Sequence, residues 1–147
     1  MLKLIKNTLY TGVCLIMVLS KTASADEVTL PPCPDKPNCV SSMAEDSKRF
    51  IEPLKISQMS PEKNYEAAWD KLLEYIQNDD SFEIDSAQYP RLTTTTTTQI
   101  FKFTDEVSFV FDPENNVIHM RSASRTGYYD FGKNRRRLEN IRQSMYK

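Results

Sequence analysis

The stretch "EVSFVFDPENNVIHMRS", residues 106–122, decides the fold of this chain. Its first half alternates apolar with polar side chains, as a strand with one buried face does. The apolar side chains that share this face are Val107, Phe109 and Phe111. The alternation resumes at Ile118 and Met120, after a run of aspartate, proline and asparagine that favours a turn. The two halves are therefore predicted to pair as an antiparallel hairpin.

Further strands are predicted upstream of this hairpin. Residues 81–89 alternate in the same way, and residues 91–103 are rich in the β-branched and aromatic side chains typical of strands. Six consecutive threonines in the second segment suit a half-exposed strand, and residues 104–106 are expected to form a tight turn. Residues 49–56 are a shorter candidate, which Pro53 places at an edge of the sheet.

Two segments have the apolar spacing of helices. In residues 60–80, Ser60 is the expected N-cap and Pro61 the first helical residue. The apolar stripe that follows consists of Tyr65, Ala68, Trp69, Leu72 and Ile76. The last helix is expected near residues 134–146, where the predicted buried side chains are Leu138, Ile141 and Met145.

This order of elements predicts an α+β fold, with an antiparallel sheet of four to five strands and two helices packed on one face. A helix-grip arrangement and a closed two-layer packing both fit the order. The chain is predicted to hold a signal peptide over residues 1–25, an extended arm with a disulfide over residues 26–48, and a single α+β domain over residues 49–147.

The first 25 residues have the pattern of a signal peptide. Lys3 and Lys6 precede an apolar stretch of roughly 11 residues, and cleavage after the small residues ending at Ala25 fits a signal peptidase. The stretch is too short to cross a hydrocarbon core of ~30 Å as a helix. An uncleaved anchor is one alternative, and a lipoprotein signal at Cys14 is another, although Val13 is not the small residue that it requires. We expect export to the periplasm or the cell exterior, with membrane association only if this segment is uncleaved.

The arm holds four prolines and the pair Cys33 and Cys39. An even pair of cysteines in an exported chain favours a disulfide. Free thiols and a metal site are the alternatives, and a metal site would need further ligands from a chain with one histidine.

Charge is divided unevenly along the chain. Residues 26–120 have 8 basic and 18 acidic side chains, whereas residues 121–147 have 8 basic and 2 acidic ones. Six of the eight arginines lie in residues 121–142. An acidic surface repels phosphate, so we expect no nucleic-acid partner.

A helical wheel separates the arginines of the last helix. Arg135 and Arg142 border the predicted buried side, Arg137 lies on the opposite flank, and Arg136 faces solvent. Asp130 is the one carboxylate of the preceding loop, and it can accept a bidentate pair from a single guanidinium.

Two stretches together resemble a known family. They are "CPDKPNCVSS", residues 33–42, and "FVFDPENNVIHMRSASRTGYYDFGKNRRRLENIR", residues 109–142, and their order resembles the uncharacterised family called domain of unknown function 1499. The resemblance covers essentially all of the chain after the signal segment. Its pattern R-S-x-S-R-x-G-x-x-D-x-G-x-N-R-x-R falls on Arg121, Ser122, Ser124, Arg125, Gly127, Asp130, Gly132, Asn134, Arg135 and Arg137. The family implies no activity, but its members are commonly exported or membrane-associated.

Several hypotheses about the function of the arginine segment fit the sequence. In one hypothesis the arginine segment is a structural lock between the last strand and the last helix. In another it binds an anionic small molecule or headgroup, with backbone N–H groups of the helix start near Asn134 adding donors. The predicted ligand-binding residues are Arg121, Ser122, Ser124, Arg125, Asp130, Asn134, Arg135 and Arg137. An interface for a partner protein on the basic face is a further alternative.

An enzyme is the remaining hypothesis. His119 is the one histidine, and a histidine alone in a strand is more often packed or exposed than catalytic. The acidic side chains of residues 79–85 could suggest calcium, but they fit better the end of a helix and an exposed strand face. The sequence has no phosphate loop, nucleophile elbow or cluster of metal ligands, so we predict no cofactor, no metal and no catalytic residue.

Overall fold

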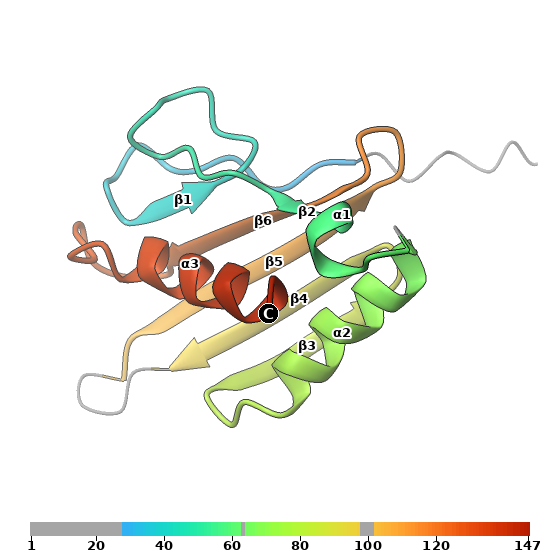
Figure 1. Ribbon diagram of the computed structural model, residues 1–147. Coiled ribbons are helices and arrows are strands. Elements are labelled where there is room, and N and C mark those ends of the chain that lie inside the picture. Colours follow the sequence, from blue (N-terminus) through green and yellow to red (C-terminus); the bar gives the residue numbers. More distant parts are fainter. Residues whose placement is uncertain (1–27, 63, 98–101) are drawn as a thin grey trace, which may run out of the picture.

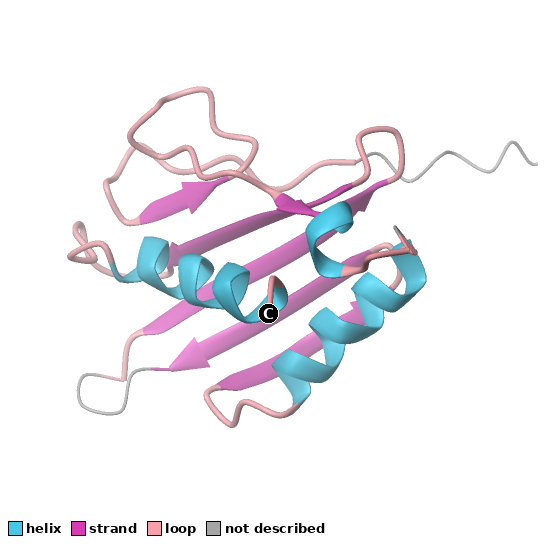
Figure 2. Cartoon of the chain, in the orientation of Figure 1, coloured by secondary structure: helices cyan, strands magenta, loops and turns pink. Residues whose placement is uncertain are grey.

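The computed structural model describes residues 28–62, 64–97 and 102–147, and its centre is a six-stranded antiparallel sheet (Figure 1). The strands are β1 (Cys39–Ser41), β2 (Leu54–Lys55), β3 (Phe82–Gln88), β4 (Arg91–Thr97), β5 (Thr104–Asp112) and β6 (Val117–Ser124). The helices are α1 (Ile56–Met59), α2 (Tyr65–Gln77) and α3 (Lys133–Met145). All three helices lie on one face of the sheet (Figure 2). The predicted α+β class is confirmed, and the sheet has one strand more than the upper expectation.

The predicted hairpin is the pair β5 and β6. Its register places Phe109 opposite Met120 and Phe111 opposite Ile118, all buried on the helix side. β4 continues the sheet beyond β5, and β3 forms the far edge. Both β1 and β2 pair with the outer side of β6, so Pro53 does precede an edge strand, although that strand has two residues.

The helix predicted from residue 60 begins later. α2 starts at Tyr65, because the side chain of Asn64 accepts hydrogen bonds from the backbone N–H groups of Glu66 and Ala67. Ser60 instead ends α1, where its N–H donates to the carbonyl of Ile56. The expected cap at Ser60 was therefore wrong, and the predicted core stripe of α2 is buried apart from Tyr65.

Two strands are longer than predicted. β5 begins at Thr104, which pairs with Thr97, so residues 104–106 are strand and not a tight turn. β6 continues to Ser124, two residues beyond the predicted segment, so Arg121 lies within the strand. Thr94, Thr95 and Thr96 are buried, so the threonine strand is less exposed than expected. Residues 100 and 101 lie outside the described ranges.

The arm is tied to the sheet. The disulfide between Cys33 and Cys39 is present, with an S–S distance of 2.02 Å, and Cys39 begins β1. Upstream of the disulfide, the carbonyl of Thr29 accepts a hydrogen bond from the side chain of Arg91, the first residue of β4, at 2.6 Å. The predicted signal segment lies outside the described residues. None of the described helices is long and apolar enough to span a bilayer.

Candidate functional site

A buried asparagine joins the arm, the last strand and the last helix. Asn134, in the first turn of α3, is fully buried. Its amide nitrogen donates to the carbonyl of Asn38 at 2.9 Å and to Ser124 Oγ at 3.0 Å. Its amide oxygen accepts from Ser122 Oγ at 2.6 Å. Two predicted serines are therefore bound within the fold by a single side chain.

Beside Asn134 lies a buried ion pair. Arg137 donates to Asp105 Oδ2 at 2.6 Å and to Ser122 Oγ at 2.9 Å. Lys133 reaches the same carboxylate at 3.0 Å. Burial by itself raises the pKa of Asp105, but hydrogen bonds from Ser124 and Arg137, together with the charge of Arg137, outweigh it and hold the pKa below its usual value.

We name this cluster the arginine lock. Its members are Asp105, Ser122, Ser124, Asn134 and Arg137. Sequence reasoning missed Asp105, because residues 104–106 were expected to be a turn. The signal was nonetheless present: the alternation of Val107, Phe109 and Phe111 extends back to Asp105, and a carboxylate at a core-facing position needs a charged partner.

Among the described residues, Asp130 is bound by backbone N–H groups and not by a guanidinium. Its carboxylate accepts from the backbone N–H of Gly132 at 3.0 Å and from that of Asn134 at 2.8 Å. The helix-start N–H of Asn134, expected to be available to an anion, is therefore already bound. Arg136 is exposed, as predicted, and donates to the carbonyl of Phe131 at 2.8 Å.

Arg121 and Arg125 lie apart from the lock. Arg121 points away from the helix side, is buried, and has Nη1 3.9 Å from Glu106. Burial lowers the pKa of Arg121, and the charge of Glu106 counteracts this. Arg125 donates to the same carboxylate at 2.9 Å. The structure thus joins Arg121 and Arg125 through Glu106, and leaves Arg135 on the other side of the sheet.

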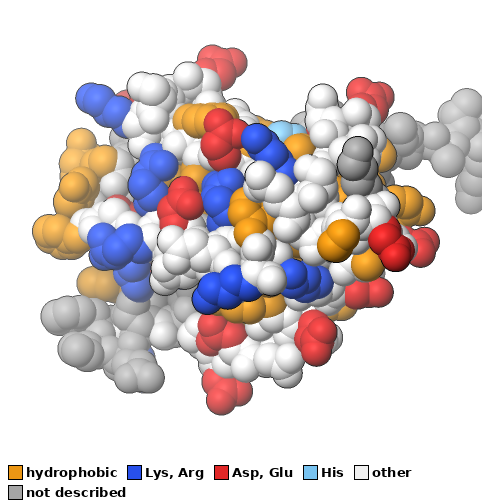
Figure 3. All heavy atoms as spheres, viewed as in Figure 1, with side chains coloured by type: hydrophobic (Ala, Val, Ile, Leu, Met, Phe, Trp, Pro, Cys, Tyr) orange, Lys and Arg blue, Asp and Glu red, His pale blue; other side chains and the backbone are white. Residues whose placement is uncertain are grey.

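Arg135 borders a groove at the start of α3. Figure 3 shows blue basic and red acidic side chains mixed over the face that bears α3. The guanidinium of Arg135 donates to the backbone carbonyls of Lys48 at 2.8 Å and Phe50 at 2.9 Å. These bonds fasten the loop after β1 to α3. Carbonyl partners leave the positive charge of Arg135 unneutralised.

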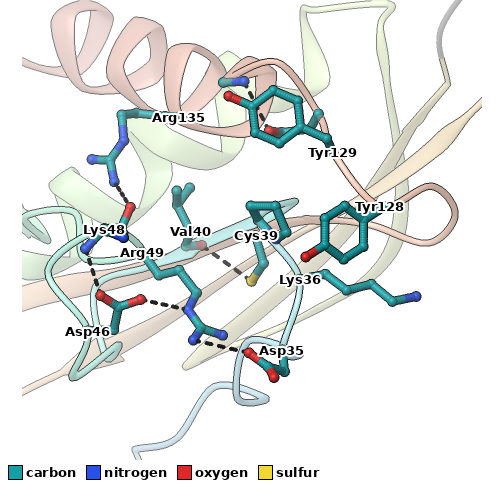
Figure 4. Close-up of a pocket in the computed structure, with 13 residues that line it drawn as sticks. Asp35, Lys36, Cys39, Val40, Asp46, Lys48, Arg49, Tyr128, Tyr129 and Arg135 are labelled. Carbon is teal, nitrogen blue, oxygen red and sulfur yellow. Dashed lines mark hydrogen bonds and ion pairs between the residues drawn. The ribbon is translucent and has the colours of Figure 1, made fainter.

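This groove, of about 490 Å³, lies between the disulfide loop and the loop before α3 (Figure 4). Figure 4 shows Arg135, Tyr128 and Tyr129 around its opening, with Cys39 and Val40 between them. Its lining residues are Asp35, Lys36, Pro37, Cys39, Val40, Asp46, Lys48, Arg49, Tyr128, Tyr129, Asp130, Gly132 and Arg135. Of the predicted ligand-binding residues, only Asp130 and Arg135 reach it.

Two of the three acids of the groove are already bound. Asp46 accepts from Arg49 Nε at 2.9 Å, and the backbone N–H of Lys48 and the side chain of Arg49 lower its pKa. Asp130 is bound to the start of α3, as described above. Asp35 stands 3.8 Å from Arg49 in solvent. The four basic side chains of the groove, Lys36, Lys48, Arg49 and Arg135, outnumber its three acids, which gives its lining a net charge of +1.

His119 lies between a hydroxyl and a carboxylate. Ser42 Oγ is 3.0 Å from its Nδ1, and Asp112 Oδ2 is 3.3 Å from its Nε2. This is the order of nucleophile, base and orienting carboxylate in hydrolases. However, Ser42 Oγ accepts the backbone N–H of Met120 at 2.9 Å and is buried, so it completes the pairing of β1 with β6. The contacts of Ser42, His119 and Asp112 therefore fit a structural role that links neighbouring strands.

The acidic run after α2 forms a turn. Asp79 Oδ1 accepts from the backbone N–H of Ser81 at 3.0 Å. Within residues 28–62, 64–97 and 102–147, no three His, Cys, Asp or Glu side chains come together as metal ligands.

Comparison with known proteins gives a single relationship. Neither the curated proteins nor the solved structures contain a significant match to the chain. A family model described as "Protein of unknown function (DUF1499)" matches residues 29–145, which include the arm, the sheet and α3. The chain therefore belongs to the DUF1499 family of proteins of unknown function.

Proposed function

We propose that this protein is a binding module whose groove beside the disulfide takes a small anion with an attached ring. The observation that supports this most strongly is the guanidinium of Arg135, which stands at the groove bound to two uncharged carbonyls. A guanidinium held in this way keeps N–H donors and a full charge for a carboxylate or phosphate.

The aromatic and apolar residues that line the groove suit the ring of such a ligand. Tyr128 and Tyr129 stand at its opening, and the apolar side chains of Val40 and Pro37 lie within it. Tyrosine offers a flat apolar face and a hydroxyl at its tip. The volume of about 490 Å³ is within the range of sites for small molecules.

The arginine lock supports the same proposal as a scaffold. It holds β6, α3 and the arm in place, and the loop that bears Tyr128 and Tyr129 runs from β6 to α3. In this proposal Ser122, Ser124, Asn134 and Arg137 position the groove wall and do not touch the ligand. Arg121 and Arg125 are the competing anion site, since they share Glu106 on the other side of the sheet.

A thermal-shift experiment distinguishes the two sites. The probe is phenyl phosphate, and the variants are Arg135→Ala and Arg125→Ala, which remove the same charge. At ten times its Kd, a ligand that binds only the folded state adds about 1.4 kcal/mol, which is a rise in Tm of roughly 5 °C for a domain of this size. We expect the rise in the wild type and in Arg125→Ala, and none in Arg135→Ala. If the rise in Tm is lost in Arg125→Ala and retained in Arg135→Ala, the anion site lies at Arg121 and Arg125. If no anion raises the Tm of the wild type, the proposal is wrong.

We also propose that the protein acts outside the cytoplasm. The disulfide between Cys33 and Cys39 persists in oxidising compartments, and it follows a segment with the pattern of an export signal.

A further inference from the structure

Three aromatic side chains project from the loop between β6 and α3. Tyr128 is 70 % exposed, Tyr129 56 % and Phe131 78 %. The rings of Tyr129 and Phe131 meet edge to face at 5.0 Å, and neither residue belongs to the described core cluster. Figure 3 shows hydrophobic side chains protruding at the end of the molecule where this loop lies in Figure 1. We name these three residues the aromatic tip.

The backbone holds Phe131 outward in a conformation that its side chain disfavours. Its φ is 56°, in the left-handed region, and the next residue, Gly132, has φ 72°. Asp130 binds the N–H of Gly132, and Arg136 binds the carbonyl of Phe131. Two side chains thus hold a backbone conformation that is strained at Phe131, and the result is an exposed phenyl ring that packing of the core does not explain.

Two arginines near the tip have backbone carbonyls as their described partners. Residues 125–137 hold five basic side chains and one acid, Asp130; Arg125 pairs with Glu106, and Lys133 and Arg137 pair with Asp105, whereas Arg135 and Arg136 bind carbonyls. Arg136 binds a carbonyl and keeps its charge. The chain before residue 121 is strongly acidic. A negative surface therefore attracts the end that bears the tip and repels the remainder, which orients the molecule.

From this combination we infer that the aromatic tip docks on an anionic lipid bilayer, with its rings among the headgroups. Tyrosine and phenylalanine rings next to Lys and Arg suit the boundary between headgroups and acyl chains. The tip protrudes and is small, which fits penetration between lipids better than the matched face that a protein partner requires. This contact does not need the N-terminal segment. Tyr128 and Tyr129 also line the groove, whereas Phe131 does not, so Phe131 is the residue at which the two roles can be separated.

The test places a fluorophore at the tip of the full-length protein. Phe131→Trp is mixed with vesicles of phosphatidylcholine and phosphatidylglycerol that contain brominated acyl chains, and the wild-type signal of Trp69 is subtracted. Tyr65→Trp is the matched control, since Tyr65 is an exposed aromatic residue at the start of α2, at the other end of the molecule. A local quencher reports the position of the probe, so binding through the N-terminal segment does not imitate the result.

We expect quenching and a blue shift for Phe131→Trp, and neither for Tyr65→Trp. Combining Phe131→Trp with Arg136→Gln should lower the apparent partition coefficient onto the vesicles about fivefold, because each basic residue near an anionic surface strengthens binding by about this factor. Three results would each overturn the inference: no quenching of Phe131→Trp, equal quenching of Phe131→Trp and Tyr65→Trp, or equal quenching in vesicles of phosphatidylcholine alone. If Phe131→Trp is not quenched, a protein partner is favoured instead. Phe131→Asn tolerates the left-handed backbone and should abolish docking while leaving phenyl phosphate binding intact, so failure of docking and failure of the groove are separable.

Discussion

Replacing Asp105 by Asn should lower the free energy of unfolding by more than the loss of an exposed ion pair would. The side chain of Asp105 is 2 % exposed and that of its partner Arg137 is 11 % exposed, with 2.6 Å between them. Breaking a buried pair costs about 3–5 kcal/mol, because it leaves a charge without a partner. We expect the lower end, about 3 kcal/mol, since Asn keeps one oxygen acceptor. Lys133 is 38 % exposed and adds little.

The assay is unfolding in urea and by heat, followed by far-UV circular dichroism and the fluorescence of Trp69. A loss of about 3 kcal/mol lowers the Tm of a domain of this size by roughly 10–15 °C. Asp46→Asn is the matched control, because Asp46 also binds an arginine, at 2.9 Å, but in solvent. Its effect should be much smaller. A Tm of Asp105→Asn equal to that of Asp46→Asn would refute the reasoning.

The pH dependence gives a second measure of the same pair. The folded pKa of Asp105 is depressed, so its stabilisation is complete above the unfolded value of about 3.9 and is lost as the pH falls through the folded value. The difference in unfolding free energy between wild type and Asp105→Asn should stay constant from neutral pH to about pH 5 and then shrink. The double variant with Arg137→Met should cost less than the sum of the single changes, and strict additivity would show that the two side chains do not interact.

Three further predictions concern the disulfide, the hydroxyl of Ser42 and the N-terminal segment. Changing Cys33 and Cys39 to serine together should cost about 2 kcal/mol, because the loop that they close is short, and a reducing agent should lower the Tm of the wild type but not of this variant. Ser42→Ala should cost about 1–3 kcal/mol, since it leaves the buried N–H of Met120 without its acceptor, whereas Ser47→Ala, on the exposed surface, should leave the urea midpoint unchanged. Sequencing the N-terminus of protein recovered outside the cytoplasm should give residue 26 as the first, and an intact Met1 would contradict cleavage near Ala25.

Local patterns predicted most of the fold. The hairpin of β5 and β6, the core stripe of α2 and the buried side of α3 all follow from periodicity over a few residues. The start of α2 did not, because Ser60 and Asn64 are both good caps and the local sequence does not decide between them; in the fold Ser60 ends α1 and Asn64 caps α2. The start of β5 was missed because "TDE" has turn composition, yet Thr104 has a partner in Thr97 across the sheet.

The site was harder to predict, since its contacts join distant parts of the chain. The concentration of arginines was visible, and Arg136 was correctly separated as solvent-facing. Which acids meet these arginines depends on sheet register: Asp105 lies opposite Ser124, and Glu106 projects to the other face. The groove needs the disulfide loop and the tyrosines together, and no local pattern relates two segments so far apart.

The bond between Asn134 and Asn38 has a consequence for how the protein folds. It spans 96 positions, and β1 likewise pairs with β6 near the other end of the chain. Contacts between such distant segments form late and slow the search for the native state. A chain still leaving the ribosome can form α2 and the β3–β4 hairpin, but it cannot close the structure until α3 has been synthesised. Synthesis that stops before residue 134 should therefore yield a chain whose arm can pair with β6 but lacks the bond from Asn134 that joins the arm to α3.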